Sequence, residues 1–220
     1  MKLSKEQSEH FDREGYLFFP SLFSPAEVKA LLDEVPALYA QRRADNVREK
    51  GSYAVRTNFA AHMYNRQFAK LARHPRMVEP IRQLFGEAVY MHQFKVNGKL
   101  AFDGDVWQWH QDYGTWARDD GMPEPRAMNI AVFLDEVMPI NGPLMLIPRS
   151  QAHGNLVHGS APNITPYPRK IVYLTLNAVS NHIRKPTRPE WIAHTDFAPI
   201  QPVPDDALTR YARRYRQAAE

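Results

Sequence analysis

The stretch WQWHQDYGTWARDDGM, which runs from Trp107 to Met122, carries a histidine and an aspartate two positions apart, His110 and Asp112. Residues i and i+2 point to the same face of a β-strand, whereas on a helix they point about 200° apart and cannot share a metal ion. The apolar run Val106–Trp109 directly before the pair favours a strand. The pair is therefore placed to offer two metal ligands from one face.

Two other His-x-Asp pairs occur in the chain, but neither has this setting. His10 and Asp12 lie in a predicted helix, and His194 and Asp196 lie in a Pro-rich segment without a strand pattern. The chain contains no cysteine, which excludes disulfides, thiolate metal sites, iron–sulfur clusters and cysteine nucleophiles. Any bound metal must therefore use histidine, aspartate or glutamate.

A third ligand has to come from a different strand. His153 and His158 are the candidates on the C-terminal side of the pair. Two histidines and one carboxylate on one side of a metal ion leave three positions open, which is the arrangement found in non-haem Fe(II) oxygenases. The residues alone leave the choice between the two histidines open.

Composition narrows the class of protein. With 220 residues, 44% hydrophobic and 24% charged, the chain has the profile of a soluble protein of one domain. No apolar run is long enough for a membrane span and no secretory signal is visible, so we expect a cytoplasmic protein without a membrane partner. The net charge is +4 with scattered basic residues, which does not indicate nucleic-acid binding and suits a small anionic ligand.

The chain divides into a helical part (about 1–86), a β core (about 87–180) and an irregular tail with a last helix (181–220), which we interpret as one domain. Capping-box patterns begin at Ser4 and Ser24. Beyond residue 86, short runs of β-branched and aromatic residues predict a sandwich or a small barrel. The expected strands are Tyr16–Phe19, Ala88–Asn97, Val106–Gln111, Ala127–Leu134, Leu144–Ile147, Asn155–His158 and Lys170–Asn177, and further helices are expected at 66–85 and Asp205–Gln217.

Three motifs occur in the chain in the same order as in the phytanoyl-CoA dioxygenase family. They are the stretch Trp107–Met122, the sequence Asn141-Gly142-Pro143-Leu144 and the sequence His158-Gly159-Ser160-Ala161-Pro162-Asn163. The chain resembles bacterial members of that family that act on ectoine and free amino acids. The resemblance implies a mainly β fold with flanking α-helices and a double-stranded β-helix (jelly-roll, cupin-like) core. It also implies a dioxygenase that uses Fe(II), 2-oxoglutarate and O2, with ascorbate helpful in vitro.

The reaction implied by this resemblance is hydroxylation of an unactivated C–H bond in a small polar metabolite, with a free amino acid or an amino-acid derivative as the expected substrate. The resemblance makes His110, Asp112 and His158 the iron ligands and catalytic residues, and leaves His153 without a ligand role. Arg169 would bind the remote carboxylate of 2-oxoglutarate, as a guanidinium grips a carboxylate with two hydrogen bonds. The other expected contacts are Gln93, Asn97, Ser160 and Trp107 for 2-oxoglutarate, and Trp116 and Lys95 for the substrate. A monomer or a homodimer is expected.

The sequence departs from the family in one region. Only 46 positions separate Asp112 from His158, several dozen fewer than is usual in the family. Pro148 is followed by Arg149-Ser150-Gln151, where Gly-Ser-His is the usual continuation. We therefore expect a missing segment near residues 151–152. Two alternatives stay open: a cupin-type metalloenzyme that does not use 2-oxoglutarate, and a non-catalytic protein that binds a metal or a ligand.

Overall fold

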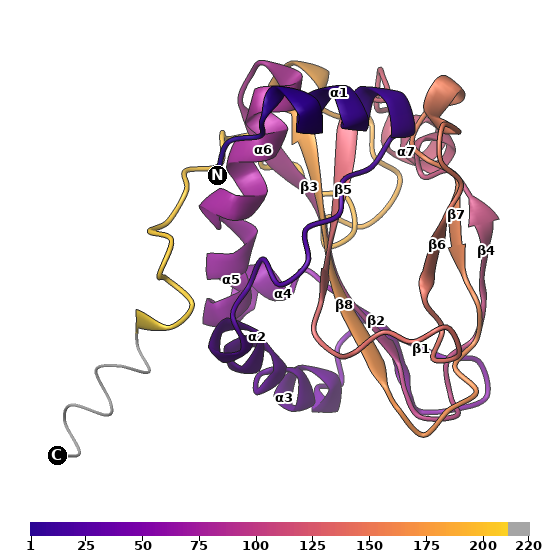
Figure 1. Ribbon diagram of the computed structural model, residues 1–220. Coiled ribbons are helices and arrows are strands. Elements are labelled where there is room, and N and C mark those ends of the chain that lie inside the picture. Colours follow the sequence, from indigo (N-terminus) through magenta and orange to yellow (C-terminus); the bar gives the residue numbers. More distant parts are fainter. Residues whose placement is uncertain (211–220) are drawn as a thin grey trace, which may run out of the picture.

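Two antiparallel β-sheets form the centre of the molecule, as the computed structural model, which describes residues 1–210, shows (Figure 1). The larger sheet has the strand order β1-β2-β3-β8-β5, and the smaller sheet has the order β4-β7-β6. The strands are β1 (Asn46–Arg48), β2 (Val55–Phe59), β3 (Val89–Lys99), β4 (Trp107–His110), β5 (Ala127–Phe133), β6 (Leu144–Leu146), β7 (His158–Ser160) and β8 (Arg169–Ala178).

The helices lie mostly before the main strands in sequence. They are α1 (Lys5–Glu14), α2 (Pro25–Leu32), α3 (Val35–Ala40), α4 (Ala61–Tyr64), α5 (Arg66–Ala72), α6 (Pro75–Phe85) and α7 (Tyr113–Asp120), with short 3-10 helices at Gln151–His153 and Val179–Asn181. Both predicted capping boxes are confirmed, because Ser4 and Ser24 each exchange hydrogen bonds with the residue three positions later. These bonds satisfy amide groups that a helix leaves unpaired at its start.

One face of the larger sheet packs against the helices, and the other lines a pocket. Phe94 on β3 and Leu174 on β8 are fully buried in the core beneath the helices. Lys95 and Tyr173, one residue away on the same strands, line a pocket on the opposite face. Figure 1 shows the helical layer on one side of the larger sheet and the smaller sheet on the other. The alternation of side chains along each strand thus separates the core from the candidate site.

The expected mainly β fold with flanking helices is observed, with local differences. Tyr16–Phe19 is not a strand, and Phe18 in this run is 72% exposed. The helical pattern at 66–85 forms α5 and α6, separated at Arg73 and His74. The N-terminal part also contributes β1 and β2. Of the helix expected at 205–217, residues 205–209 form turns and residues 211–217 lie outside the described range.

Within residues 1–210, none of the helices has the length and apolar character needed to cross a membrane.

Candidate metal centre and active site

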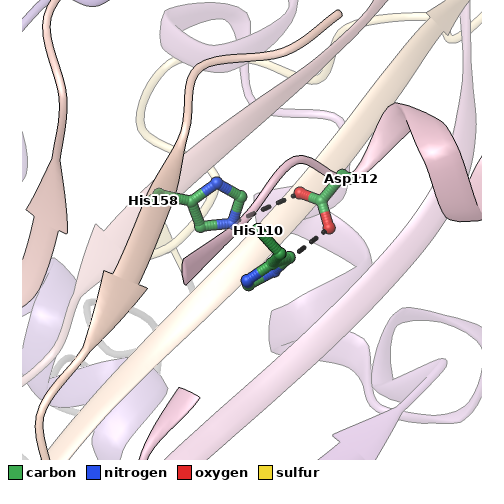
Figure 2. Close-up of side chains that lie close together, drawn as sticks. All are labelled: His110, Asp112 and His158. Atoms are coloured by element: carbon green, nitrogen blue, oxygen red, sulfur yellow. Dashed lines mark ion pairs between the residues drawn. The ribbon is translucent and has the colours of Figure 1, made fainter. Parts of the chain in front are cut away.

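His110, Asp112 and His158 come together where β4 and β7, two of the three strands of the smaller sheet, meet the start of α7. His110 ends β4, Asp112 is the N-cap of α7, and His158 begins β7 directly opposite His110 in the strand register. One ligand atom from each residue lies within 4.8 Å of the others, and no other such group occurs within residues 1–210. The Nε2 atoms of His110 and His158 lie 3.6 Å and 3.5 Å from the Asp112 carboxylate (Figure 2).

The two imidazole rings are oriented by the backbone. Nδ1 of His110 lies 2.6 Å from the carbonyl oxygen of Gln108, and Nδ1 of His158 lies 2.9 Å from that of Leu156. A carbonyl oxygen only accepts, so each Nδ1 carries the hydrogen and each Nε2 keeps its lone pair. Metal-binding histidines are commonly fixed in this way. The residues present therefore fit a divalent metal ion held by two imidazoles and one carboxylate.

Asn129 on β5 orients the carboxylate. Its amide nitrogen donates to Oδ2 of Asp112 over 2.5 Å, and its amide oxygen accepts a hydrogen bond of 2.6 Å from Thr175 on β8. Asn129 and Thr175 are partners in the β5–β8 register. Neither residue was predicted from the sequence. The available signal was a polar side chain inside an otherwise apolar strand, Ala127–Phe133.

A pocket adjoins the three residues and contains most of the predicted site. Its lining includes eight of the ten residues that were singled out from the sequence: Lys95, Asn97, Trp107, His110, Asp112, His158, Ser160 and Arg169. The lining residues that were missed are Asn129, Leu144, Gly159 and Tyr173. Tyr173 lies in strand register opposite Lys95, so its position follows from the β3–β8 pairing. The topology thus gathers residues from six strands, β3 to β8, around one cavity.

The family model described as phytanoyl-CoA dioxygenase (PhyH) matches residues 11–153, well over half of the chain. The chain belongs to this family. The match includes His110 and Asp112 and ends before His158. The resemblance inferred from the sequence motifs is confirmed.

Curated and solved relatives of this PhyH-family protein are similar over nearly the whole chain. L-proline trans-4-hydroxylase of Streptomyces griseoviridis is 31% identical over 255 residues, which covers 90% of this chain and 95% of the relative. Ectoine dioxygenase of Bordetella bronchiseptica is 32% identical over 266 residues, covering 91% and 86%. The crystal structure of EctD from S. alaskensis with 2-oxoglutarate and 5-hydroxyectoine matches with a TM-score of 0.86 and 34% identity, covering 91% of this chain and 87% of that chain.

More remote structures share the fold alone. The 2-oxoglutarate-dependent epimerase SnoN from nogalamycin biosynthesis, at 18% identity, matches with a TM-score of 0.70. The double-stranded β-helix core expected for this PhyH-family chain is confirmed by its structural neighbours.

The charged groups of the metal centre shift one another's pKa values. Burial alone would raise the pKa of Asp112, but the adjacent His110 imidazole and the charge of Lys95 outweigh it and hold that pKa far below its usual range. The adjacent Asp112 carboxylate raises the pKa of His110, whereas burial lowers the pKa of His158. Asp112 is therefore ionised at neutral pH and His158 is neutral, which are the forms that bind a metal ion.

Two cations in the pocket lack a carboxylate partner. Arg169 is 2% exposed, and its guanidinium donates to the carbonyl oxygen of Gly142. Lys95 lies with its Nζ 5.7 Å from the centre of the Tyr173 ring. Within residues 1–210 neither forms an ion pair, and burial lowers the pKa of both. Buried charges without partners are costly, so these positions are suited to anionic ligand groups.

Gln93 and Asn97 on β3 also have unsatisfied atoms. The amide nitrogen of Gln93 and the amide oxygen of Asn97 are buried without a hydrogen-bond partner among residues 1–210. Buried amides of this kind usually bind a ligand or water. Gln93 does not itself line the pocket but lies two residues before Lys95 on the same strand.

The two predicted tryptophans differ in their surroundings. Trp107 lines the pocket, and its ring is covered by the guanidinium of Arg56 at 4.0 Å. Trp116 is 1% exposed and packs in a small apolar cluster with Met122 and Ile183, outside the pocket lining. The structure thus brings Trp107 to the metal centre and places Trp116 behind it.

Proposed function

We propose that this protein is an Fe(II)- and 2-oxoglutarate-dependent dioxygenase that hydroxylates an unactivated C–H bond of a small polar molecule, a free amino acid or a derivative of one. The observation that carries the proposal is the two-histidine, one-carboxylate group, which opens into the same pocket as the buried, unpaired Arg169. The names of the relatives, proline hydroxylase and ectoine dioxygenase, support the reaction type and the substrate class.

In this proposal His110, Asp112 and His158 hold the iron, and Asn129 keeps the carboxylate in its binding orientation. Bound iron supplies the activation of O2 that amino-acid side chains cannot provide. The imidazoles bind through Nε2 because their Nδ1 hydrogens are engaged by backbone carbonyls. The protein's own contribution is the geometry of the three ligands and the placement of charged groups around them.

We assign Arg169 to the remote carboxylate of 2-oxoglutarate. Its side chain reaches the pocket from the first residue of β8, and the carbonyl of Gly142 fixes its position from the side. The other residues that we assign to this ligand are Asn97, Ser160 and Trp107, which line the pocket, and Gln93 beside it.

Lys95 is left for the substrate. 2-oxoglutarate has two carboxylates, of which one would face Arg169 and the other the metal ion. Lys95 is a second cation in the pocket without an ion-pair partner, so we expect it to bind a further negative group, such as the carboxylate of an amino acid. We also assign Trp116 to the substrate side. The expected oligomeric state, a monomer or a homodimer, stays a prediction that light scattering would test.

The deciding experiment is succinate formation from 2-oxoglutarate with Fe(II), ascorbate and O2, across free amino acids and ectoine-like compounds. We expect one compound to stimulate turnover and to gain one oxygen atom. His110→Ala should abolish both signals, because one of the three ligands is lost. Substrate-stimulated turnover that persists in His110→Ala would overturn the proposal. Metal binding without O2 consumption for any compound would favour the non-catalytic alternative.

A further inference from the structure

The end of α1 is bonded to the connection between β6 and β7, residues 147–157. The amide of Arg149 donates to the backbone carbonyl of Glu14 over 3.0 Å. The Arg149 guanidinium donates to both carboxylate oxygens of Glu14, each over 2.9 Å. Glu14 is only 13% exposed in this pair. Exposed ion pairs usually contribute little, but a bidentate pair that is reinforced by a backbone bond is a defined contact.

Arg149 adopts a backbone conformation that suits glycine. Its φ is +66°, in the left-handed region, which costs a residue with a Cβ about 1–2 kcal/mol. Glycine is the usual residue of the family at this position, as the sequence analysis notes. In this chain an arginine occupies it, and the strain is offset by the three hydrogen bonds to Glu14.

A second contact joins the same two segments. The side-chain amide of Gln151 donates to the carbonyl of Asp12 over 3.2 Å, at the end of α1 where carbonyls lack helical partners. Gly15 follows the helix with φ +86°, and a Cβ there would lie 2.7 Å from Leu156 and 2.8 Å from Gln151. A larger residue at Gly15 would therefore have to displace the side chains of Leu156 and Gln151, in a backbone conformation that already favours glycine.

The other end of α1 is fixed to the helical layer. The backbone amide and carbonyl of Leu3 exchange hydrogen bonds of 2.8 Å and 3.0 Å with the side chain of Gln83 on α6. Figure 1 shows α1 crossing the top of the molecule from α6 towards α7. The helix thus links the helical layer to the connection between the strands of the smaller sheet.

This connection leads directly to the distal histidine. His158 begins β7, one residue after Val157, whose amide donates to the Ser150 hydroxyl over 2.8 Å. Gln111, between the two proximal ligands, donates to the carbonyls of Ser150 and Asn155 over 3.0 Å and 2.7 Å. A shift of the connection would therefore displace residues on both sides of the metal centre.

We propose that the Glu14–Arg149 pair is a positioning latch, through which α1 holds the β6–β7 connection and so keeps His158 in place for metal binding. The inference rests on the proposed function for the presence of a metal ion at His110, Asp112 and His158. Neither Glu14 nor Arg149 touches the metal centre, so both are positioning residues.

The test is the affinity for Co(II), titrated by its visible absorption in the metal-free protein without any turnover. Arg149→Gly removes the guanidinium and also relieves the backbone strain, so the fold is retained. We expect it to weaken Co(II) binding by about 3- to 10-fold, less than the 10- to 100-fold typical of groups bonded directly to a metal ligand. Glu14→Gln, which leaves the backbone unchanged, should have a similar effect.

Arg13→Ala is the matched control. Arg13 donates to the same Glu14 carboxylate over 2.8 Å, and within residues 1–210 the hydrogen bonds of its side chain stay within α1. We expect its Co(II) affinity to equal that of the unmodified protein. The double variant Glu14→Gln, Arg149→Gly should bind Co(II) no more weakly than either single variant, since both remove one interaction.

The outcomes separate the latch from the proposed function. If the unmodified protein binds no Co(II), the proposed function fails. If it binds Co(II) and Arg149→Gly and Glu14→Gln bind equally well, the latch is refuted and the metal centre stands. Losses in the two single variants that add in the double variant would also refute it, because the residues would then act separately.

Discussion

Single hydrogen bonds decide which ring nitrogen of each histidine is free to bind a metal ion. Each histidine bonds through Nδ1 to the carbonyl two residues earlier in the chain, so this part of the geometry is local. Local geometry is what a sequence pattern can predict, and the His-x-Asp pair was found in this way. Asn129 was not, because its contact with Asp112 depends on how β5 is placed beside α7. The choice of His158 over His153 came from the family resemblance, since the residues alone left it open.

The charge of Arg169 should determine the affinity for 2-oxoglutarate. Arg169→Gln keeps a donor for the Gly142 carbonyl but removes the bidentate, charged contact. A charge-assisted hydrogen bond contributes about 1.5–3 kcal/mol, so we expect the KM for 2-oxoglutarate to rise by about 10- to 100-fold with Co(II) affinity unchanged. Steady-state kinetics with varied 2-oxoglutarate would measure this change.

The matched control for Arg169 is Arg118→Gln on α7, whose side chain is 72% exposed and paired with Asp119. It should leave the KM unchanged. An unchanged KM in Arg169→Gln as well would favour the cupin-type alternative, which has no need of this arginine.

Strands were predicted well where their own sequence has a clear strand pattern. They were predicted poorly where pairing with a neighbouring strand decides whether the segment is a strand. The expected strands at 88–97, 127–134 and 170–177 correspond to β3, β5 and β8, which pair with one another along most of their length. β1 and β2 were missed, since they are short and contain polar residues; β1 is stabilised by pairing with β2, and β2 by pairing with β1 and β3. Tyr16–Phe19 has strand-like residues but pairs with no strand. Pairing is a property of the fold, and a single segment does not reveal it.

At the scale of elements, the half-buried His62 and the buried His194 join α4 to the segment that follows β8. The ring centres of His62 and His194 lie 4.9 Å apart, and His62 also stacks on Phe94 of β3 at 4.8 Å. The amide of His194 donates to the carbonyl of His92, also on β3. Burial lowers the pKa of His62 to about 3 and that of His194 to about 4. Both rings are therefore neutral in the folded protein at ordinary pH.

These two histidines predict a loss of stability in mild acid. In the unfolded chain they take up protons near pH 6.5, whereas in the folded protein they stay neutral until about pH 3 and 4. The unfolded state then binds more protons, so the free energy of unfolding decreases as the pH falls from 6.5 towards 4. We expect a loss on the order of 2–3 kcal/mol per histidine at pH 4.5, measured by urea denaturation of the metal-free protein.

His62→Gln and His194→Gln should each flatten this pH dependence, and the exposed His182→Gln is the control that should not. His110 acts in the opposite direction: its pKa is raised, so its contribution is present below pH 6.5 and is lost as the pH rises through the folded value. The comparison of variant with parent at each pH separates the two effects. Equal slopes for all four proteins would show that this pair does not titrate on unfolding.

On the scale of the whole molecule, the alignment with a relative contains many positions that this chain does not fill. The alignment with the proline hydroxylase extends over 255 positions, yet 90% of 220 residues is about 198, so about 57 positions of the alignment have no counterpart here. The sequence analysis places this shortfall near residues 151–152, which stays a prediction. In the structure, β6 and β7 are joined by residues 147–157 alone. His110 remains 38% exposed and Trp109 51% exposed beside it.

With an exposed metal centre, we expect part of the 2-oxoglutarate to be broken down without hydroxylation of the substrate. Efficient coupling of its breakdown to hydroxylation requires that water be kept from the reacting groups, commonly by a segment that closes over the substrate. With a short β6–β7 connection and a partly exposed His110, we expect clearly more succinate than hydroxylated product. Mass spectrometry of both products measures the ratio, with EctD from S. alaskensis assayed in parallel as the comparison. Equal amounts of succinate and product in this protein would show that the residues present already enclose the substrate, and that the missing positions serve another purpose.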